Sequence, residues 1–122
     1  MESSIRSIRP FIGAANHEIS SAFYRAWGWQ ELPLPHKMSF FRQGDFGFYL
    51  QDYFVEDWVG NTMLFLEVED LPKYRDHLLT LNLTDQFPSV RIKADIVEND
   101  WGREFFVHDP SNVLWHIGEF YR

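Results

Sequence analysis

Two side chains in this sequence, His116 and Arg9, are of types that could act on or hold a bound molecule. An imidazole titrates near neutral pH, so His116 could serve as a general base or as a direct ligand contact. The guanidinium of Arg9 could bind an anionic group of a ligand or pair with Glu67. Both residues also have simpler interpretations. His116 could be a buried core or interface histidine, and Arg9 could lie in solvent or at a dimer interface.

The common catalytic motifs are absent from the sequence. It has no cysteine, which excludes disulfides, Cys-ligated zinc, iron–sulfur clusters and thiol nucleophiles. It contains no Gly-Xaa-Ser-Xaa-Gly elbow, no phosphate-binding glycine loop and no His-Glu-Xaa-Xaa-His helix. The acidic residues Glu67, Glu69 and Asp70 form no convincing acid–base pair, and Asp70 is better interpreted as a helix cap. We therefore predict no catalytic residue.

The composition and net charge of the chain argue against several classes of binding partner. The net charge is −7 and no basic run is present, which argues against nucleic acid and anionic membranes. With 45% hydrophobic residues the chain is expected to fold. The only apolar stretch near the start, residues 10–15, is too short for a signal-peptide core or a membrane span. A cytoplasmic location is the expectation.

The elements that must position these residues follow one pattern twice. In the first half we expect a strand at 8–13, a helix from Asn16 to Gly28, and strands at 29–32, 39–42 and 46–51. In the second half we expect a strand at 62–68, a helix from Asp70 to Asn82, and strands at 90–97, 104–108 and 113–120. The chain is thus predicted to be one α+β domain, 1–122. Its two βαβββ units span 5–53 and 62–122, with a loop at 54–61 between them.

Alternation along the strands separates two sets of residues. The residues expected to face the helices are Ile8, Pro10, Ile12, Leu64, Leu66 and Val68. The residues expected to face away are Arg9, Phe11, Gly13, Met63, Phe65 and Glu67. Because the second set contains polar residues, we expect its face to border a cavity.

Aromatic residues make up 18% of the chain, which is high for a small domain. We expect Tyr49, Met63, Phe65 and Phe106 to form an apolar wall for a planar ligand, although these residues could also be ordinary sheet core. Trp101 precedes Gly102 at a strand entrance, where the glycine could simply permit a bulge or a tight turn. Trp58 could cover a ligand or hold its loop to the surface.

Several segments resemble the vicinal oxygen chelate superfamily of glyoxalases, extradiol dioxygenases, fosfomycin-resistance enzymes and bleomycin-resistance proteins. The most specific are Trp101-Gly102-Arg103-Glu104-Phe105 and Asp109-Pro110-Ser111-Asn112. The others are Ala22-Phe23-Tyr24-Arg25 with Trp27-Gly28-Trp29, Phe41-Arg42-Gln43-Gly44-Asp45 and Gly60-Asn61-Thr62. The closest likeness is to bleomycin-resistance proteins. The resemblance implies mixed sheets that each curl around a cup-shaped cavity, with helices on the outer face of the sheets. It also implies dimers with these cavities near the interface, and it places Trp101 close to the drug-binding groove.

The resemblance also implies where metal-dependent members would hold their ion. The first-strand positions fall on Arg9 and Met63, and the last-strand positions fall on Tyr49 and His116. Only His116 could bind a divalent metal well, since such sites need about three His or carboxylate donors. The chain therefore departs from the metal-dependent pattern, and we expect no metal and no cofactor.

These observations predict a homodimeric, bleomycin-resistance-like binding protein that sequesters a small aromatic or cationic molecule without a metal. The predicted ligand contacts are Arg9, Phe11, Tyr49, Met63, Phe65, Trp101, Phe106 and His116. The alternative is an enzyme of the lyase or dioxygenase type with His116 in its active site. That enzyme would use either a metal with donors such as Glu67 or Glu104, or His116 as a base. A ligand sensor or a subunit of a larger assembly is a third possibility, and exchange of the N-terminal strand between subunits stays open.

Overall fold

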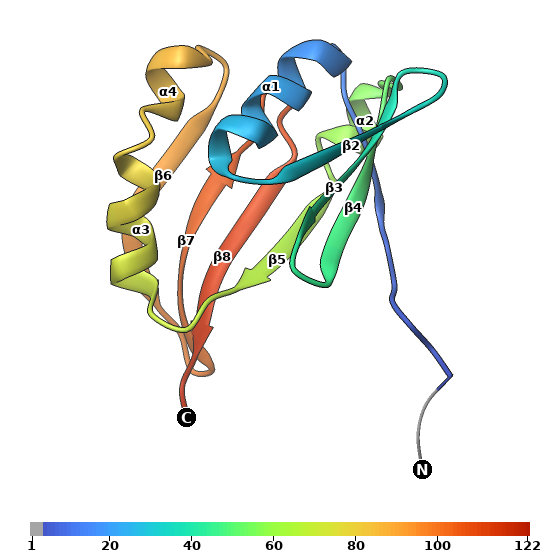
Figure 1. The fold of residues 1–122 in the computed structure, drawn as a ribbon. Coiled ribbons are helices and arrows are strands. Elements are labelled where there is room, and N and C mark those ends of the chain that lie inside the picture. Colours follow the sequence, from blue (N-terminus) through green and yellow to red (C-terminus); the bar gives the residue numbers. More distant parts are fainter. Residues whose placement is uncertain (1–3) are drawn as a thin grey trace.

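The computed structural model describes residues 4–122; Met1–Ser3 of the predicted domain lie outside the described residues. The first unit consists of β1 (Phe11–Gly13), α1 (His17–Trp27), β2 (Gln30–Leu34), β3 (Met38–Gln43) and β4 (Phe46–Gln51). A short helix, α2 (Glu56–Val59), follows. The second unit consists of β5 (Met63–Glu67), α3 (Leu71–Leu79), α4 (Leu83–Gln86), β6 (Arg91–Glu98), β7 (Gly102–His108) and β8 (Leu114–Phe120) (Figure 1). The doubled βαβββ pattern is confirmed, whereas α2 and α4 were not predicted.

Each unit builds one four-stranded mixed sheet. The strand orders are β1-β4-β3-β2 and β5-β8-β7-β6, so the two sheets share one topology. In both, the first strand is parallel to the last, and the remaining pairs are antiparallel. The α+β fold with two mixed sheets is therefore confirmed. The strands β1, β2, β5 and β6 form the sheet edges.

Local sequence signals fix the ends of the two longer helices. The side chain of Asn16 accepts a hydrogen bond from the Ile19 N–H at 3.0 Å at the start of α1. Gly28 ends that helix with φ +118°, a left-handed conformation that glycine adopts without strain. Asp70 accepts from the Lys73 N–H at 3.1 Å and begins α3. Both predicted caps are confirmed.

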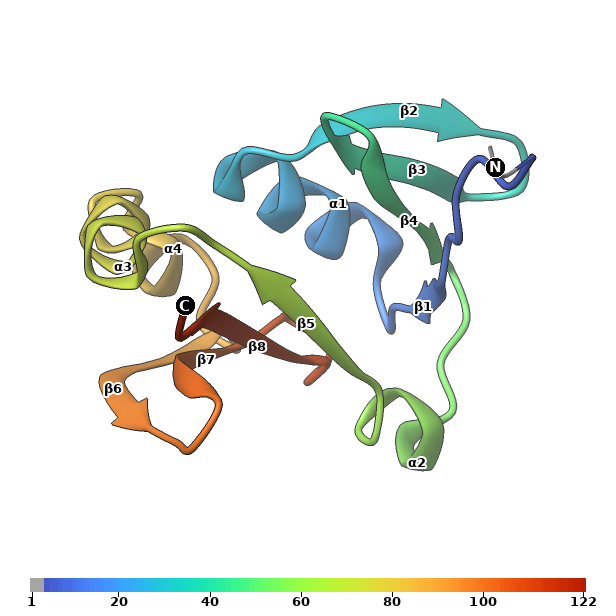
Figure 2. The ribbon, with the colours of Figure 1, turned by 90° about the horizontal axis from the view of Figure 1, so that it is seen from below.

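The two units share one core. Helix α1 lies between the strands of the first sheet and those of the second (Figure 2). The Trp115 ring of β8 lies 5.0 Å from the ring of Trp27 and 5.4 Å from the rings of Trp29 and Phe48. Tightly packed aromatic contacts thus join the sheets through their inner faces.

A buried carboxylate ties α1 to the turn before β8. The hydroxyl of Tyr24 donates to Asp109 Oδ2 at 2.7 Å and accepts from Trp115 Nε1 at 3.0 Å. Asp109 Oδ1 accepts the backbone N–H groups of Ser111 and Val113, both at 2.8 Å. The predicted turn after Asp109 is thus held by its own first side chain.

The predicted alternation holds for β1 and β5 but fails in the residues before β1. Ile12 is 2% exposed while its neighbour Phe11 is 56% exposed. Leu64, Leu66 and Val68 pack against the core, and Met63, Phe65 and Glu67 are exposed. The expectation for Ile8 and Pro10 was wrong, because Ile8 is 93% exposed and Pro10 is also exposed. Pro10 has no N–H to donate, so strand pairing with β4 begins only at Phe11.

Among residues 4–122, no helix combines the length and the apolar character that a membrane span requires.

Candidate functional site

Arg9, Phe11, Phe40 and Tyr49 form a first aromatic face on the outer side of the first sheet. The Phe11 and Tyr49 rings stack 4.6 Å apart, and Phe40 lies 5.1 Å from Tyr49. These three residues are register neighbours on β1, β4 and β3, so the pairing of the strands brings them together. Arg9 Nη1 donates to the Tyr49 hydroxyl at 3.1 Å, and the guanidinium carbon lies 4.3 Å from the Phe40 ring centre. The face therefore carries a cation held against aromatic rings.

A second aromatic face covers the outer side of the second sheet and consists of Phe65, Trp101, Phe106, His116 and Phe120. The His116 ring lies between Phe106 at 5.2 Å and Phe65 at 6.3 Å, its register neighbours on β7 and β5. The Phe65, Trp101 and Phe120 rings lie within 5.3 to 5.5 Å of one another.

Gly118 makes room for this arrangement. A Cβ at position 118 would lie 2.4 Å from Phe65 Cζ, so the Phe65 ring lies directly over the glycine backbone.

A glutamate orients His116. Glu104 Oε1 lies 2.8 Å from His116 Nδ1, and Asn99 Nδ2 donates to Glu104 Oε2 at 2.9 Å. A carboxylate accepts hydrogen bonds only, so Nδ1 carries the proton and Nε2 of the neutral ring is left as an acceptor. Such an imidazole can accept a proton or a hydrogen bond from a ligand.

The sequence indicates Glu104 only as a possible metal donor and does not predict its hydrogen bond to His116, because Glu104 is the diagonal neighbour of His116 across the β7–β8 ladder. Glu104 lies opposite Gly118, and His116 lies opposite Phe106. A diagonal contact of this kind requires the strand register. The signal in the sequence is the spacing of Glu104 and Phe106, two residues apart on one strand, and of His116 and Gly118 on the next.

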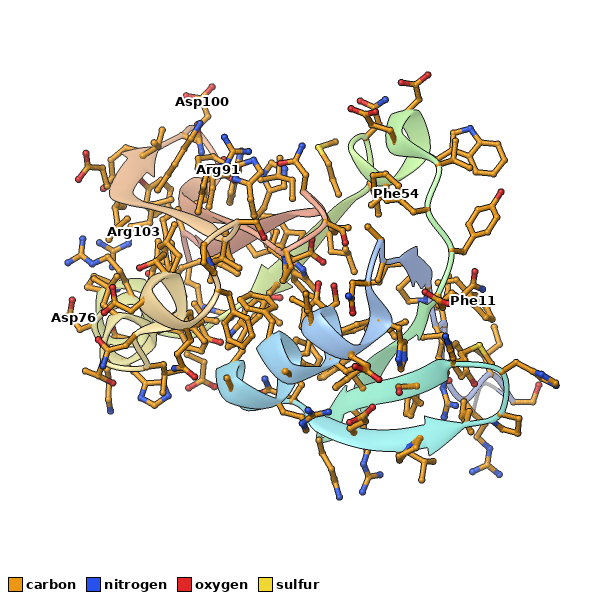
Figure 3. All side chains as sticks on the ribbon, turned by 90° about the horizontal axis from the view of Figure 1, so that it is seen from above. Phe11, Phe54, Asp76, Arg91, Asp100 and Arg103 are labelled. Carbon is orange, nitrogen blue, oxygen red and sulfur yellow. The ribbon has the colours of Figure 1, made fainter. Side chains whose placement is uncertain are left out.

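Seven of the eight predicted ligand residues divide between the two faces, and Met63 belongs to neither. Arg9, Phe11 and Tyr49 belong to the first, whereas Phe65, Trp101, Phe106 and His116 belong to the second. In residues 4–122 no hydrogen bond, ion pair or ring contact joins the two groups. Phe48 and Trp115 point into the shared core, so the next residues, Tyr49 and His116, point outward from it. Phe11 on β1 and Arg103 on β7 lie at opposite sides of the view in Figure 3.

Of the two tryptophans singled out from the sequence, Trp58 belongs to neither face and Trp101 belongs to the second. Trp58 on α2 is exposed, and its ring is 6.2 Å from that of Tyr53, away from both faces. Gly102, after Trp101, permits a close approach of strands, since a Cβ there would lie 2.1 Å from the Glu119 carbonyl oxygen. Met63 lies mostly exposed at the start of β5.

A cavity of about 570 Å³ opens around the edge of β5. Its inner wall contains Leu64, Leu66, Trp29, Phe48 and Trp115, and its outer wall contains Phe65 and Phe120 of the second aromatic face. Exposed Glu67, Glu69 and Arg122 also line it, and Arg122 pairs with Glu67 at 3.4 Å. This volume suits a drug-sized ligand. The sequence predicts a cavity beside Phe65 and Glu67, and both residues line this one. Alternation assigns Leu64 and Leu66 to the side that packs against the helices, so it does not predict that they also line the cavity.

The residues at the metal positions of the superfamily do not fit a divalent ion. Arg9 and Tyr49 lie together on the first sheet, whereas Met63 and His116 lie on the second. Within the described part of the chain no group of three His, Asp or Glu side chains could hold a metal. A guanidinium, a thioether and a phenol are poor ligands for zinc, iron or manganese. We derive no metal-dependent step for these residues.

The fold of this chain is also found in solved structures of known proteins. No protein-family model matches the sequence, and no curated protein sequence matches it. Solved structures with this fold include bleomycin-binding proteins, a lactoylglutathione lyase and a glyoxalase/bleomycin resistance protein/dioxygenase. The resemblance inferred from the sequence is confirmed at the level of the fold.

Three particular structures illustrate the likeness. The bleomycin-binding protein from Streptomyces verticillus, solved with copper(II)-bleomycin, has a TM-score of 0.80 and 18% identity over 98% of this chain and 100% of its own. The antibiotic-binding protein TnmS3 from a Streptomyces strain has a TM-score of 0.71 and 19% identity over 98% and 100%. A lactoylglutathione lyase from Agrobacterium tumefaciens has a TM-score of 0.68 and 17% identity over 96% of both chains. The TM-scores establish a shared fold.

Proposed function

We propose that this chain is a cytoplasmic, homodimeric protein that binds a small aromatic or cationic molecule and does not transform it. The observation that supports this most is the continuous aromatic surface around β5, where the cavity of about 570 Å³ meets the second aromatic face. Phe65, Trp101 and Phe120 leave their rings partly exposed, which favours stacking with a flat ligand.

Charge supports a cationic part in the ligand. Glu67 and Glu69 line the cavity. Of these two glutamates, Glu67 pairs with Arg122, and Glu69 has no ion-pair partner among the described residues. The net charge of −7 attracts cations during diffusion. A ligand with an aromatic body and a positive group would therefore satisfy the rings and the carboxylates together.

A dimer would unite the predicted ligand residues. The two aromatic faces point away from the core of one chain, so a ligand that touches both requires a second copy. We propose that the first face of one protomer lies opposite the second face of its partner. Light scattering on the purified protein measures its mass directly, and a monomer at tens of micromolar would contradict this arrangement.

Titration calorimetry with bleomycin and with copper(II)-bleomycin tests the ligand class. We expect saturable heat with one ligand site per chain. The Phe65→Ala variant should bind at least tenfold more weakly, since it loses one ring of the stacked group. The matched control is Phe54→Ala, because Phe54 is exposed to the same 44% as Phe65 and belongs to neither face. No heat up to millimolar ligand would reject the bleomycin assignment.

The orientation of His116 by Glu104 favours a second candidate, an enzyme that uses His116 as a base without a metal. Mass spectrometry of ligand recovered after prolonged incubation in D₂O separates the two functions. Unchanged ligand with no deuterium gained at carbon supports binding alone. Deuterium that appears with the native protein and not with His116→Gln supports proton transfer by His116.

A further inference from the structure

Three arginines surround a small hollow beside the β3–β4 turn. Arg6, Arg9 and Arg42 line this arginine hollow of about 260 Å³, together with Ser7, Phe40, Gly44 and Asp45. All three arginines are exposed. Since the chain as a whole has a charge of −7, this group is a local reversal of sign.

The three guanidinium groups have no acidic partner among the described residues. Within residues 4–122, no carboxylate oxygen lies within 4.0 Å of a nitrogen of Arg6, Arg9 or Arg42, although Asp45 lines the same hollow. By contrast, Arg25 and Arg103 each pair with a glutamate, at 2.5 Å and 3.3 Å. Three positive groups against one carboxylate leave the hollow with an excess of positive charge.

Two of the arginines are held in place by neutral partners. Arg9 lies over the Phe40 ring and donates one terminal nitrogen to Tyr49. Arg42 donates Nε to Gln30 Oε1 at 3.1 Å, which leaves both of its terminal nitrogens without a hydrogen-bond partner in the described chain. A guanidinium fixed in this way loses little freedom when it binds, and its planar donors suit the oxygens of an oxyanion.

We propose that the arginine hollow binds the anionic end of the ligand, a phosphate-type oxyanion, while the adjoining first aromatic face binds an aromatic part of the same molecule. The chemical class of this part of the ligand is an aryl phosphate or a similar aromatic oxyanion; the positive group proposed above would be a separate part of the ligand that faces Glu67 and Glu69. This inference rests on the proposed function for the aromatic part only, because the hollow itself can hold a free anion. It adds Arg6 and Arg42 to the predicted ligand contacts and gives Arg9 the anionic partner.

Titration of the full chain with phenyl phosphate, inorganic phosphate and phenol at fixed ionic strength tests the proposal. Phenyl phosphate should bind at least tenfold more tightly than either of the other two, and more weakly as salt is raised. Arg42→Gln should weaken phenyl phosphate binding about tenfold, and Asp45→Asn should strengthen it several-fold. The matched control Arg91→Gln removes the same charge from exposed β6 and should leave the affinity unchanged.

Equal affinity in Arg42→Gln, Arg91→Gln and the native chain would overturn the proposal. A second pair of results would also overturn the proposal: no anion binds the native chain, and the Arg42→Gln chain no longer forms a dimer. The arginines would then pair with carboxylates of a second copy. Arg42-dependent binding of phenyl phosphate without any binding of bleomycin would support the anion site while the bleomycin assignment fails. Bleomycin binding without phenyl phosphate binding would do the reverse.

Discussion

Asp109 should make the folded protein less stable as the pH rises. Burial raises the pKa of this carboxyl from its ordinary 3.8 to about 6, despite the hydrogen bonds from Tyr24, Val113 and Ser111 that lower it. The folded state thus favours the protonated carboxyl. The stabilisation is complete below pH 3.8 and is lost as the pH rises through about 6.

The size of the effect follows from the two pKa values. Their difference of about 2.2 corresponds to about 3 kcal/mol in the free energy of unfolding. About 2 kcal/mol of this should be lost between about pH 4.5 and 7.5, since an unfolded aspartate is already mostly ionised at the lower limit. Tyr24 stays protonated throughout, because burial raises its pKa well above the ordinary value and the adjacent Asp109 raises it further.

Urea unfolding followed by far-ultraviolet circular dichroism measures this effect as a difference between the native chain and Asp109→Asn. Asparagine keeps an oxygen for the Ser111 and Val113 N–H groups but cannot ionise. Taking the difference between the two chains cancels the contributions of other titrating groups, which both chains share. One of these is Glu119, whose pKa is lowered by the N–H of Leu71, so that its contribution to stability changes with pH in the opposite direction. We expect the advantage of the native chain over Asp109→Asn to shrink by about 2 kcal/mol across this pH range. The control Asp95→Asn, on exposed β6, should give a constant difference. A constant difference for Asp109→Asn as well would refute the reasoning.

Three further predictions concern single residues. Gly118→Ala should displace the Phe65 ring and weaken bleomycin binding about tenfold, as measured by calorimetry. The control Thr84→Ala on α4 should leave bleomycin binding unchanged. Unchanged affinity in Gly118→Ala would mean that the position of the Phe65 ring does not matter. Tyr24→Phe should lower the free energy of unfolding by about 1 to 3 kcal/mol in urea, because Asp109 loses a donor and Trp115 loses an acceptor; a loss below measurement error would contradict this. Asn16→Ala should cost about 1 kcal/mol in thermal unfolding through loss of the α1 cap, and Asn16→Asp, which keeps an acceptor, should restore most of it.

The repeated fold could be predicted because its signals are local. The caps at Asn16 and Asp70 and the glycine at position 28 define the helices without reference to the rest of the chain. The alternation of Phe11 with Ile12 separates the two sides of β1. Ile8 was assigned wrongly because alternation assumes a continuous strand, and Pro10 interrupts the pairing.

The site was harder to predict, because its contacts depend on register and on packing between the units. The Glu104–His116 contact crosses a ladder diagonally, so its two members have no fixed spacing along the sequence. Leu64 and Leu66 pack against the core and also line the cavity around β5. Alternation indicates which side a residue faces, but it does not indicate whether that side is filled.

The five tryptophans lie in different environments, so the intrinsic fluorescence of the chain can report on ligand binding. The indoles of Trp27, Trp29 and Trp115 are shielded in the core and should emit at short wavelengths, whereas Trp58 and Trp101 are in contact with water and should emit at longer ones. A water-soluble quencher such as iodide should therefore extinguish only the red part of the emission. A ligand that binds beside Trp101 would shield that indole from the quencher, so ligand binding could be followed without any added label.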